Sequence, residues 1–249
     1  MKIFVCIKRV PDTESRIRIA ADGQSIEASG IKFVISPYDE YALETALRMK
    51  DANGGGEVVT ITVGDAQSAE QLRTSLAMGA DRAIHLNGET TLDGLATARA
   101  LAAELKDQEA DLILAGMKAA DDDQQQTGPM LAEILGLPCI TVAAALEVDD
   151  GKVRAHREIE GGVEHVEAAL PAVVTITKGD FEPRLPSLKG IMAAKKKPFD
   201  EKPADLPESR VRLHGLSYPP ERPPGKIVGN GADAVPELIR LLKEEAKAF

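Results

Sequence analysis

Short apolar runs alternate with segments of helical periodicity along the first half of the chain. Lys2–Ile7, Glu57–Val63 and Asp111–Ala115 are nearly continuous apolar runs, which is typical of strands buried on both faces of a parallel sheet. Ala83–Leu86 is a shorter extended run. Apolar residues recur at helical spacing in four further segments: from Ser36 to Asn53, from Asp65 to Gly79, over Thr91–Gln108, and over Met130–Leu135 before Gly136. This alternation predicts a right-handed, doubly wound parallel sheet.

The pattern changes after Pro138. Three extended segments joined by turns rich in Gly and Asp predict an antiparallel meander, over Cys139–Val148, Lys152–Glu160 and Val163–Leu170. One further buried strand is expected at Pro171–Thr177. We therefore expect an α/β domain over residues 1–182, with a Rossmann-like, mostly parallel sheet and an antiparallel extension.

Residues 183–249 have the composition of an arm rather than of a core. Prolines recur through Pro183–Gly225 and interrupt any long helix or strand. Within this arm the apolar segment Leu185–Met192 precedes the three lysines Lys195–Lys197. The segment is either a docking surface for another protein or a solvated loop over its own domain. The chain ends in an amphipathic segment, Ala232–Phe249, which predicts a helix whose apolar face a partner subunit would cover.

Composition and charge exclude several classes of partner. The 249 residues are 43% hydrophobic but only 3% aromatic with no Trp, so platforms for stacking single-stranded bases are not expected. A net charge of −10 argues against nucleic acid or an anionic membrane surface as the main partner. No apolar run approaches the ~20 residues of a membrane span. The chain enters its first strand without a signal-peptide pattern, and Cys6 and Cys139 form no metal-like cluster, so we expect a cytoplasmic protein.

The polar loop Gly116–Thr127 is the main candidate for chemistry. It leaves the carboxyl end of a predicted parallel strand, where open α/β sheets bind ligands. Gln126 or Thr127 lies at the start of the next helix, where free backbone N–H groups favour a phosphate. The alternative is a plain polar turn with a helix cap, because no phosphate-loop lysine or paired-glycine motif accompanies it.

Two other segments leave similar alternatives open. Lys8 and Arg9 follow the first strand directly and could meet a phosphate or lie in a solvated loop. Ser36 and Pro37 fit the cap and first position of a helix, a sufficient explanation of both residues.

The same region offers no enzyme machinery. Asp111–Pro129 contains no cysteine or histidine and only one lysine, so it holds no evident pair of nucleophile and base. The chain also lacks the triphosphate loop of nucleotide-hydrolysing enzymes. The four histidines show no helical ligand spacing, and we expect no metal site.

Several motifs, in this order along the chain, resemble the beta (small) subunit of electron-transfer flavoproteins. They extend from Lys2 to about Lys197 and comprise Lys8–Val10, Leu76–Arg82, Asp121–Gly128, Arg157–Gly162, Leu170–Thr175, Glu182–Arg184 and Ile191–Lys197. Each motif is weak alone, but the ordered set is specific. The C-terminal arm resembles the family in character more than in letters.

The resemblance implies a non-catalytic subunit that buries AMP and pairs with an alpha subunit holding most of the FAD. It places the AMP contacts on Cys6, Ser36, Pro37, Tyr38, Asp39, Val63, Gly116, Met117, Lys118, Ala119, Ala120, Asp121, Asp122, Asp123, Gln124, Gln125, Gln126 and Thr127. It also implies that Leu188 anchors partner dehydrogenases such as acyl-CoA dehydrogenases, and that Glu158 touches the mobile flavin domain of the alpha subunit. A quinone oxidoreductase would accept the electrons downstream.

A subclass of the same family provides the alternative function. Its members bind a second FAD in place of AMP and bifurcate electrons, and their loop typically reads Asp-Gly-Asp-Thr-Ala-Gln-Val-Gly. The present chain has Asp-Asp-Asp-Gln-Gln-Gln-Thr-Gly at 121–128, which is the AMP-type form. Ser36 and Asp39 stand where some members have Asn and Cys, and Thr13 where several have an aromatic residue near the flavin.

Overall fold

The computed structural model describes residues 1–89, 93–222 and 224–249. Its helices are α1 (Pro37–Ala52), α2 (Ala69–Met78), α3 (Gly94–Leu105), α4 (Thr127–Leu135), α5 (Leu188–Ala194) and α6 (Val235–Glu244), with 3-10 turns at Ala66–Ser68 and Ala232–Ala234. Its strands are β1 (Lys2–Cys6), β2 (Arg9–Pro11), β3 (Phe33–Ile35), β4 (Glu57–Gly64), β5 (Arg82–Asn87), β6 (Leu112–Gly116), β7 (Cys139–Asp149), β8 (Lys152–Ile159), β9 (Gly162–Ala169), β10 (Ala172–Ile176) and β11 (Phe199–Pro203).

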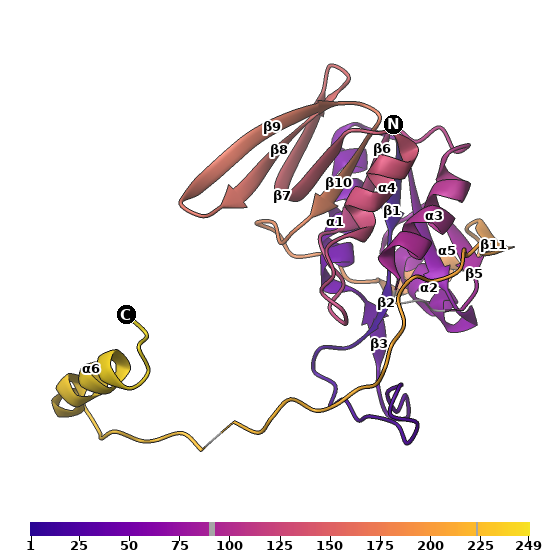
Figure 1. Ribbon diagram of the computed structural model, residues 1–249. Coiled ribbons are helices and arrows are strands. Elements are labelled where there is room, and N and C mark those ends of the chain that lie inside the picture. Colours follow the sequence, from indigo (N-terminus) through magenta and orange to yellow (C-terminus); the bar gives the residue numbers. More distant parts are fainter. Residues whose placement is uncertain (90–92, 223) are drawn as a thin grey trace.

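A nine-stranded sheet of order β11-β5-β4-β1-β6-β10-β7-β8-β9 forms the body of the molecule (Figure 1). The strands from β11 to β7 in this order pair parallel to one another, and β8 and β9 add an antiparallel hairpin. Ile3 of β1 lies opposite Val58 of β4 and Leu112 of β6, so three predicted strands form the centre. The predicted fold class, a mostly parallel doubly wound sheet with an antiparallel extension, is confirmed.

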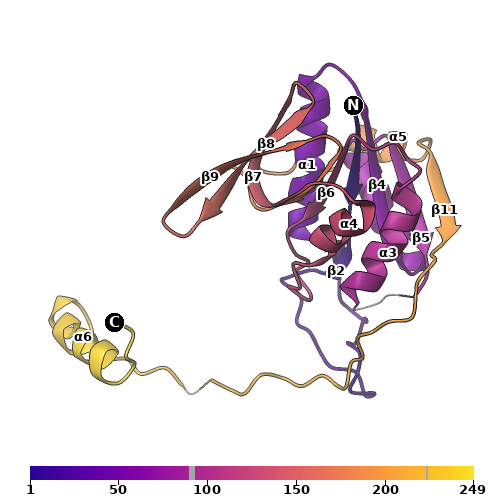
Figure 2. The same ribbon diagram turned by 45° about the horizontal axis from the view of Figure 1, so that its top comes forward.

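Helices cover both faces of the parallel part of the sheet (Figure 2). The core on one face contains Leu43 of α1 and Leu72 of α2, packed against side chains such as Val5. The core on the other face contains Leu101 of α3 and Leu131 of α4. Burial on both faces is the reason that these strands are almost entirely apolar.

Strand order reverses direction at β1. The chain passes from β1 outward through β4 and β5, and then returns to place β6 and β10 on the other side of β1. The loops that leave β1 and β6 therefore diverge, which opens a crevice at the carboxyl ends of these strands. The two-stranded ribbon of β2 and β3 lies at that end in Figure 1.

Three local predictions differ from the structure. Arg9–Pro11, expected in a loop, is strand β2 and pairs antiparallel with β3. The helix expected from Thr91 is described from Gly94, with Asp93 as its N-cap; Thr91 lies outside the described residues. Ser36 occupies the N-cap position of α1, but its hydroxyl makes no capping hydrogen bond.

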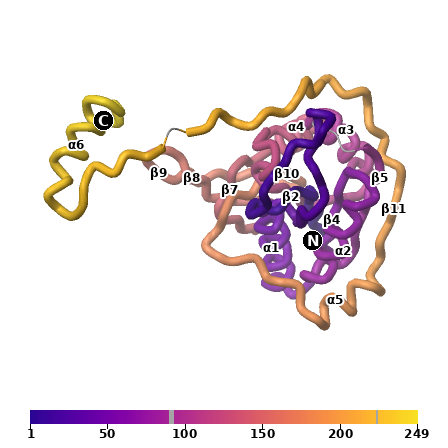
Figure 3. Tube along the Cα trace, turned by 90° about the horizontal axis from the view of Figure 1, so that it is seen from below, coloured from indigo at the N-terminus to yellow at the C-terminus, as the bar shows by residue number. Residues whose placement is uncertain are grey.

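The first part of the C-terminal arm belongs to the body. β11 adds a parallel strand beside β5, and α5 packs against α2. Arg82 Nε donates to Asp200 Oδ2 at 2.7 Å, which fixes β11 in this position. From β11 the arm runs along one side of the body as an extended segment (Figure 3), and α6 lies away from the sheet (Figures 1 and 2).

Candidate functional site

A cavity of about 420 Å³ lies at the carboxyl edge of the sheet, at the reversal in strand order. Cys6 of β1, Val63 of β4 and Gly116 of β6 line it, because the three strands are parallel and their carboxyl ends lie at one edge of the sheet. The loop after β6 and the first turns of α3 and α4 form further walls. The sheet and both helical layers therefore converge on one hollow.

Asp39 joins the two loops that diverge at this point. Its Oδ2 accepts a hydrogen bond from the backbone N–H of Lys8 at 2.8 Å, and its Oδ1 accepts one from Gly116 at 2.8 Å. The side chain is buried in the first turn of α1. One carboxyl group thus ties the end of β1 to the end of β6, beneath the cavity.

Burial raises the pKa of Asp39 to about 7, although the hydrogen bonds from Lys8 and Gly116 act in the opposite direction. The folded chain therefore holds this proton more tightly than the unfolded chain, whose ordinary value is 3.8. The contribution of Asp39 to the free energy of unfolding is complete below that value and is lost as pH rises through about 7.

We expect the stability difference between the wild type and Asp39→Asn to shrink as pH rises from about 4 to about 7. Urea unfolding of both proteins, at one protein concentration and at several pH values in that range, gives the free energy of unfolding of each. The wild type minus variant difference removes the other titrating groups, which both proteins share. A difference that stays constant with pH would show that Asp39 has an ordinary pKa.

Lys8 closes the loop onto the end of β1. Its ammonium donates to Asp121 Oδ1 and Asp122 Oδ2, both at 2.8 Å. Burial favours the neutral lysine, but the hydrogen bonds to the two carboxylates outweigh it and raise the pKa of Lys8. The lysine is thus not free in a solvated loop: it links the end of β1 to the polar loop.

The end of the polar loop leads into α4 at the edge of the cavity. Asp123 and Gln125 have positive φ angles of 53° and 56°, so the chain turns sharply before α4. Gln126 is the N-cap of α4 and makes no side-chain capping bond, and Thr127 begins the helix. The first N–H groups of a helix have no partner within it, and they carry the positive end of its dipole. This geometry suits a phosphate group.

Comparison with known proteins supports a family assignment. The family model described as "Electron transfer flavoprotein domain" matches residues 25–207. The chain is 43% identical to electron transfer flavoprotein subunit beta of Syntrophomonas wolfei, over 99% of this chain and 98% of that protein. It is 41% identical to the Bacillus subtilis subunit over the full length of both chains, and 38% identical to the human subunit over 98% and 97%. The chain belongs to the electron transfer flavoprotein beta-subunit family. Its function is electron transfer, as a subunit of an electron carrier.

Most of the residues expected at the site of this beta subunit line the cavity. They are Cys6, Asp39, Val63, Gly116, Met117, Lys118, Ala119, Asp121, Asp122, Gln124, Gln125, Gln126 and Thr127. Ser36, Pro37, Tyr38, Ala120 and Asp123 are not among the lining residues. Asp123 instead accepts a hydrogen bond from Lys118 at 2.9 Å.

Several lining residues of the beta subunit lie outside the AMP contacts that the resemblance implies, although Arg9, with Lys8, is a possible phosphate contact on the sequence alone. Arg9 stacks on Phe33, with 3.5 Å between the guanidinium carbon and the ring centroid, and its buried Nε has no partner in the described part of the chain. Leu213 and Leu216 line the cavity from the C-terminal arm. The Lys8–Arg9 pair was a usable signal for the first of these. The two leucines lie in a segment without periodicity, so no pattern distinguished them.

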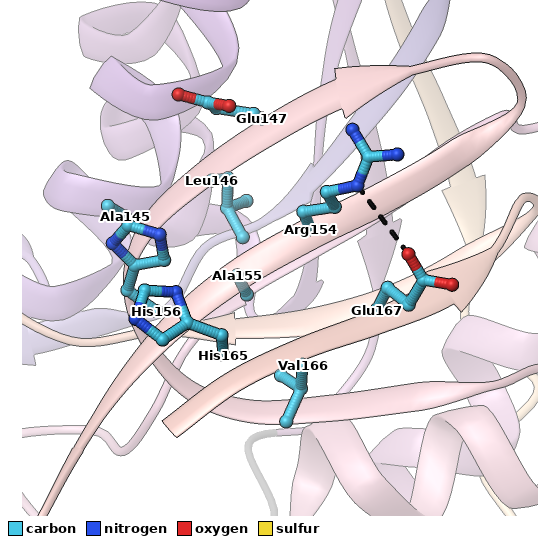
Figure 4. A pocket seen from close by; sticks show the side chains of 9 residues that line it. All are labelled: Ala145, Leu146, Glu147, Arg154, Ala155, His156, His165, Val166 and Glu167. Carbon is cyan, nitrogen blue, oxygen red and sulfur yellow. Dashed lines mark ion pairs between the residues drawn. The ribbon is translucent and has the colours of Figure 1, made fainter. Parts of the chain in front are cut away.

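A second concavity of about 390 Å³ lies on the antiparallel extension (Figure 4). His156 of β8 pairs with His165 of β9 across the strands, and their ring centroids are 4.3 Å apart. Arg154 and Glu167 form an ion pair beside them at 3.5 Å. No three His, Cys, Asp or Glu side chains are grouped to hold a metal ion in residues 1–89, 93–222 and 224–249. No helix in these same ranges is long and apolar enough to cross a membrane.

The two residues expected to meet partners lie outside the cavity. Leu188 is the first residue of α5 and is 84% exposed. Glu158 is exposed on β8. The structure thus separates the cavity from both expected contact points.

Proposed function

We propose that this beta subunit binds AMP in the cavity as a structural ligand and joins an alpha subunit that holds most of the FAD. The observation that carries the proposal is the convergence of the polar loop, the α4 N-terminus and the ends of β1, β4 and β6 on one hollow. The residues present fit the group: backbone N–H groups around Thr127 suit one phosphate, and the buried Nε of Arg9 is a donor without a partner in the described chain.

The charges around the loop favour a monophosphate. Lys8 is paired with Asp121 and Asp122, and Lys118 is paired with Asp123 at 2.9 Å. Both lysines that line the cavity are therefore neutralised by carboxylates. A diphosphate or triphosphate would bring further negative charge beside these acids. AMP places a single phosphate at the helix N-terminus, where backbone dipoles alone can hold it.

We expect AMP to remain with the purified heterodimer. Denaturing the protein and separating the released nucleotides by ion-exchange chromatography measures the ratio of AMP to FAD, which should be one to one. Two equivalents of FAD and no AMP would instead identify an electron-bifurcating subunit. A visible spectrum of the native heterodimer provides an independent count of the flavins.

The segment from Arg184 to Lys197 docks partner dehydrogenases. At its start, the Arg184 side chain donates to the buried Glu44 of α1 through Nε at 2.7 Å and through Nη2 at 3.2 Å. At its end, Lys197 Nζ donates to the carbonyls of Leu76 and Ala80 at 2.9 and 2.6 Å, at the C-terminal end of α2. Both ends are thus tied to helices of the body.

Between these two fixed ends, apolar side chains point to solvent. Leu185, Leu188 and Met192 are 86%, 84% and 73% exposed. Gly190 lies so close to Ala77 that a Cβ atom would meet its carbonyl oxygen, so α5 rests directly on the end of α2. Exposed apolar side chains on a segment that is fixed at both ends can insert into a pocket on a transient partner. Leu188, at the start of the helix, is the anchor.

Helix α6 and Glu158 of β8 contact the alpha subunit. The face of α6 that contains Val235, Leu238 and Ile239 is exposed, and a partner chain would bury it. Glu158 contacts the mobile flavin domain of the alpha subunit. The beta subunit then receives no electrons itself: it holds the assembly together and holds a dehydrogenase such as an acyl-CoA dehydrogenase within reach of the FAD, from which a quinone oxidoreductase takes the electrons.

A further inference from the structure

The C-terminal arm forms one wall of the cavity. Leu213 and Leu216 line the same hollow as Cys6 and Thr127, although they lie far from both in the sequence. Figure 3 shows the arm passing α3 and the loop between β2 and β3 on its way from β11. Residues 209–218 are called the strap below.

Hydrogen bonds fix the strap to two segments of the cavity rim. They are Arg210 N–H to Asp93 Oδ2 at 2.6 Å, Leu216 N–H to Gly23 O at 2.7 Å, and Ile19 N–H to Tyr218 Oη at 2.9 Å. Asp93 caps α3 and precedes Gly94, a lining residue. Gly23 precedes Gln24, another lining residue. The strap is therefore attached to the same elements that shape the hollow.

We propose that Leu213 and Leu216 contact the bound nucleotide and that the strap closes the site over its base and ribose. The inference rests on the proposed AMP site. The strap supplies apolar side chains, which suit the uncharged part of a nucleotide and disfavour its phosphate. The phosphate then lies at the polar wall where α4 begins. A nucleotide in the cavity removes the two leucines from water, and this burial stabilises both the ligand and the strap.

Linkage makes the effect reciprocal. If the strap tightens AMP binding by some factor, AMP must favour the closed strap by the same factor. The chain beyond the strap leads to α6, whose exposed apolar face awaits a partner. Nucleotide binding therefore also fixes the position from which the chain after residue 218 leaves the body. This reduces the number of positions that α6 can take before it meets a partner subunit.

The test compares heterodimers that contain wild-type beta subunit, Leu213→Ala/Leu216→Ala, or the control Val211→Ala. Val211 is in the strap and half exposed, but it does not line the cavity. After removal of bound nucleotide, AMP is titrated by calorimetry. We expect the Kd to rise about tenfold or more in the double variant and to stay unchanged in the control. The two leucines are also replaced singly, so that a double variant that fails to assemble leaves the test intact.

Hydrogen exchange provides the reciprocal readout. AMP should protect the amides of residues 209–218 in the wild type and in the control, and less so in the leucine variants. The inference would be overturned by an unchanged Kd in the leucine variants, or by wild-type amide exchange rates in residues 209–218 that AMP does not change. Either result would leave the AMP site in place. A wild type that binds no AMP would overturn the proposed function itself, and the inference with it.

Discussion

Leu188→Ala should lower the rate of dehydrogenase-coupled reduction by about ten- to a hundredfold while FAD, AMP and the heterodimer remain intact. A leucine that enters an apolar pocket contributes about 1.5–3 kcal/mol, and each 1.4 kcal/mol is about a factor of ten. Transient complexes depend on a few such anchors. Leu188 makes no core contact that its loss would weaken, because it is 84% exposed.

Leu185→Ala is the matched control for this experiment. Leu185 has the same chemistry, is 86% exposed, and lies before α5 rather than on it. Steady-state reduction of the heterodimer by a partner dehydrogenase gives kcat/KM for each protein. Wild-type rates in Leu188→Ala would exclude the anchor, and equal losses in both variants would replace the single anchor by a docking patch.

Electrostatic docking through Lys195–Lys197 is the rival explanation. The structure restricts how it can be tested, because Lys197 donates to two carbonyls at the end of α2. Replacing Lys197 would disturb the segment that presents Leu188. Lys195→Gln/Lys196→Gln leaves that contact in place. If charge governs docking, this variant loses rate and its salt dependence becomes shallower; if Leu188 governs it, the rate is nearly unchanged.

The sheet could be predicted because its strands are buried on both faces. β1, β4 and β6 are mostly apolar, and their lengths, with a helix after each, leave little choice other than a parallel doubly wound sheet. β11 was not predicted, because it is an edge strand that does not need apolar residues. Its sequence, Phe-Asp-Glu-Lys-Pro, is polar, because an edge strand can be held by side-chain ion pairs. Arg82 with Asp200 and Lys202 with Glu104 are such pairs, at 2.5 and 2.6 Å.

The sequence predicted which loop lines the cavity, but not the contacts within that cavity. The loop Gly116–Thr127 could be selected as the ligand-binding candidate because it lies after β6 and before α4. The role of Asp39 depends on N–H groups 31 and 77 residues away, and a local reading finds only an acid in the first turn of α1. Lys8 likewise meets carboxylates 113 and 114 residues away. Contacts at such separations arise from the fold and leave no periodic trace in the sequence.

Gly116→Ala should remove AMP from the heterodimer and lower its Tm by roughly 4–10 °C. A Cβ atom at Gly116 would meet Asp39 Oδ1 and would lie 2.8 Å from the backbone nitrogen of Asp39 and from the carbonyl carbon of Tyr38. These are mostly backbone atoms of α1, so no side-chain rotation can relieve the overlap. The first turn of α1 must move away from β6.

That movement would break more than a steric contact. Asp39 holds the N–H groups of Lys8 and Gly116 together, and Lys8 in turn holds Asp121 and Asp122 of the polar loop. A shift of α1 therefore opens the walls of the cavity, and each buried group left without a partner costs about 1–3 kcal/mol. Asp39→Asn separates the two effects, because it keeps the volume and loses one acceptor. We expect it to lower AMP content without the full loss of Tm.

Gly162→Ala is the control for the backbone substitution itself. Gly162 begins β9, a Cβ atom there meets nothing within 4 Å, and its φ is not positive. Thermal unfolding and nucleotide content are measured for heterodimers that contain wild-type, Gly116→Ala, Asp39→Asn or Gly162→Ala beta subunit. Gly162→Ala should match the wild type in both measurements. If Gly116→Ala also matched it, the close contact between α1 and β6 would not shape the site, and the cavity would have to be held open by the polar loop alone.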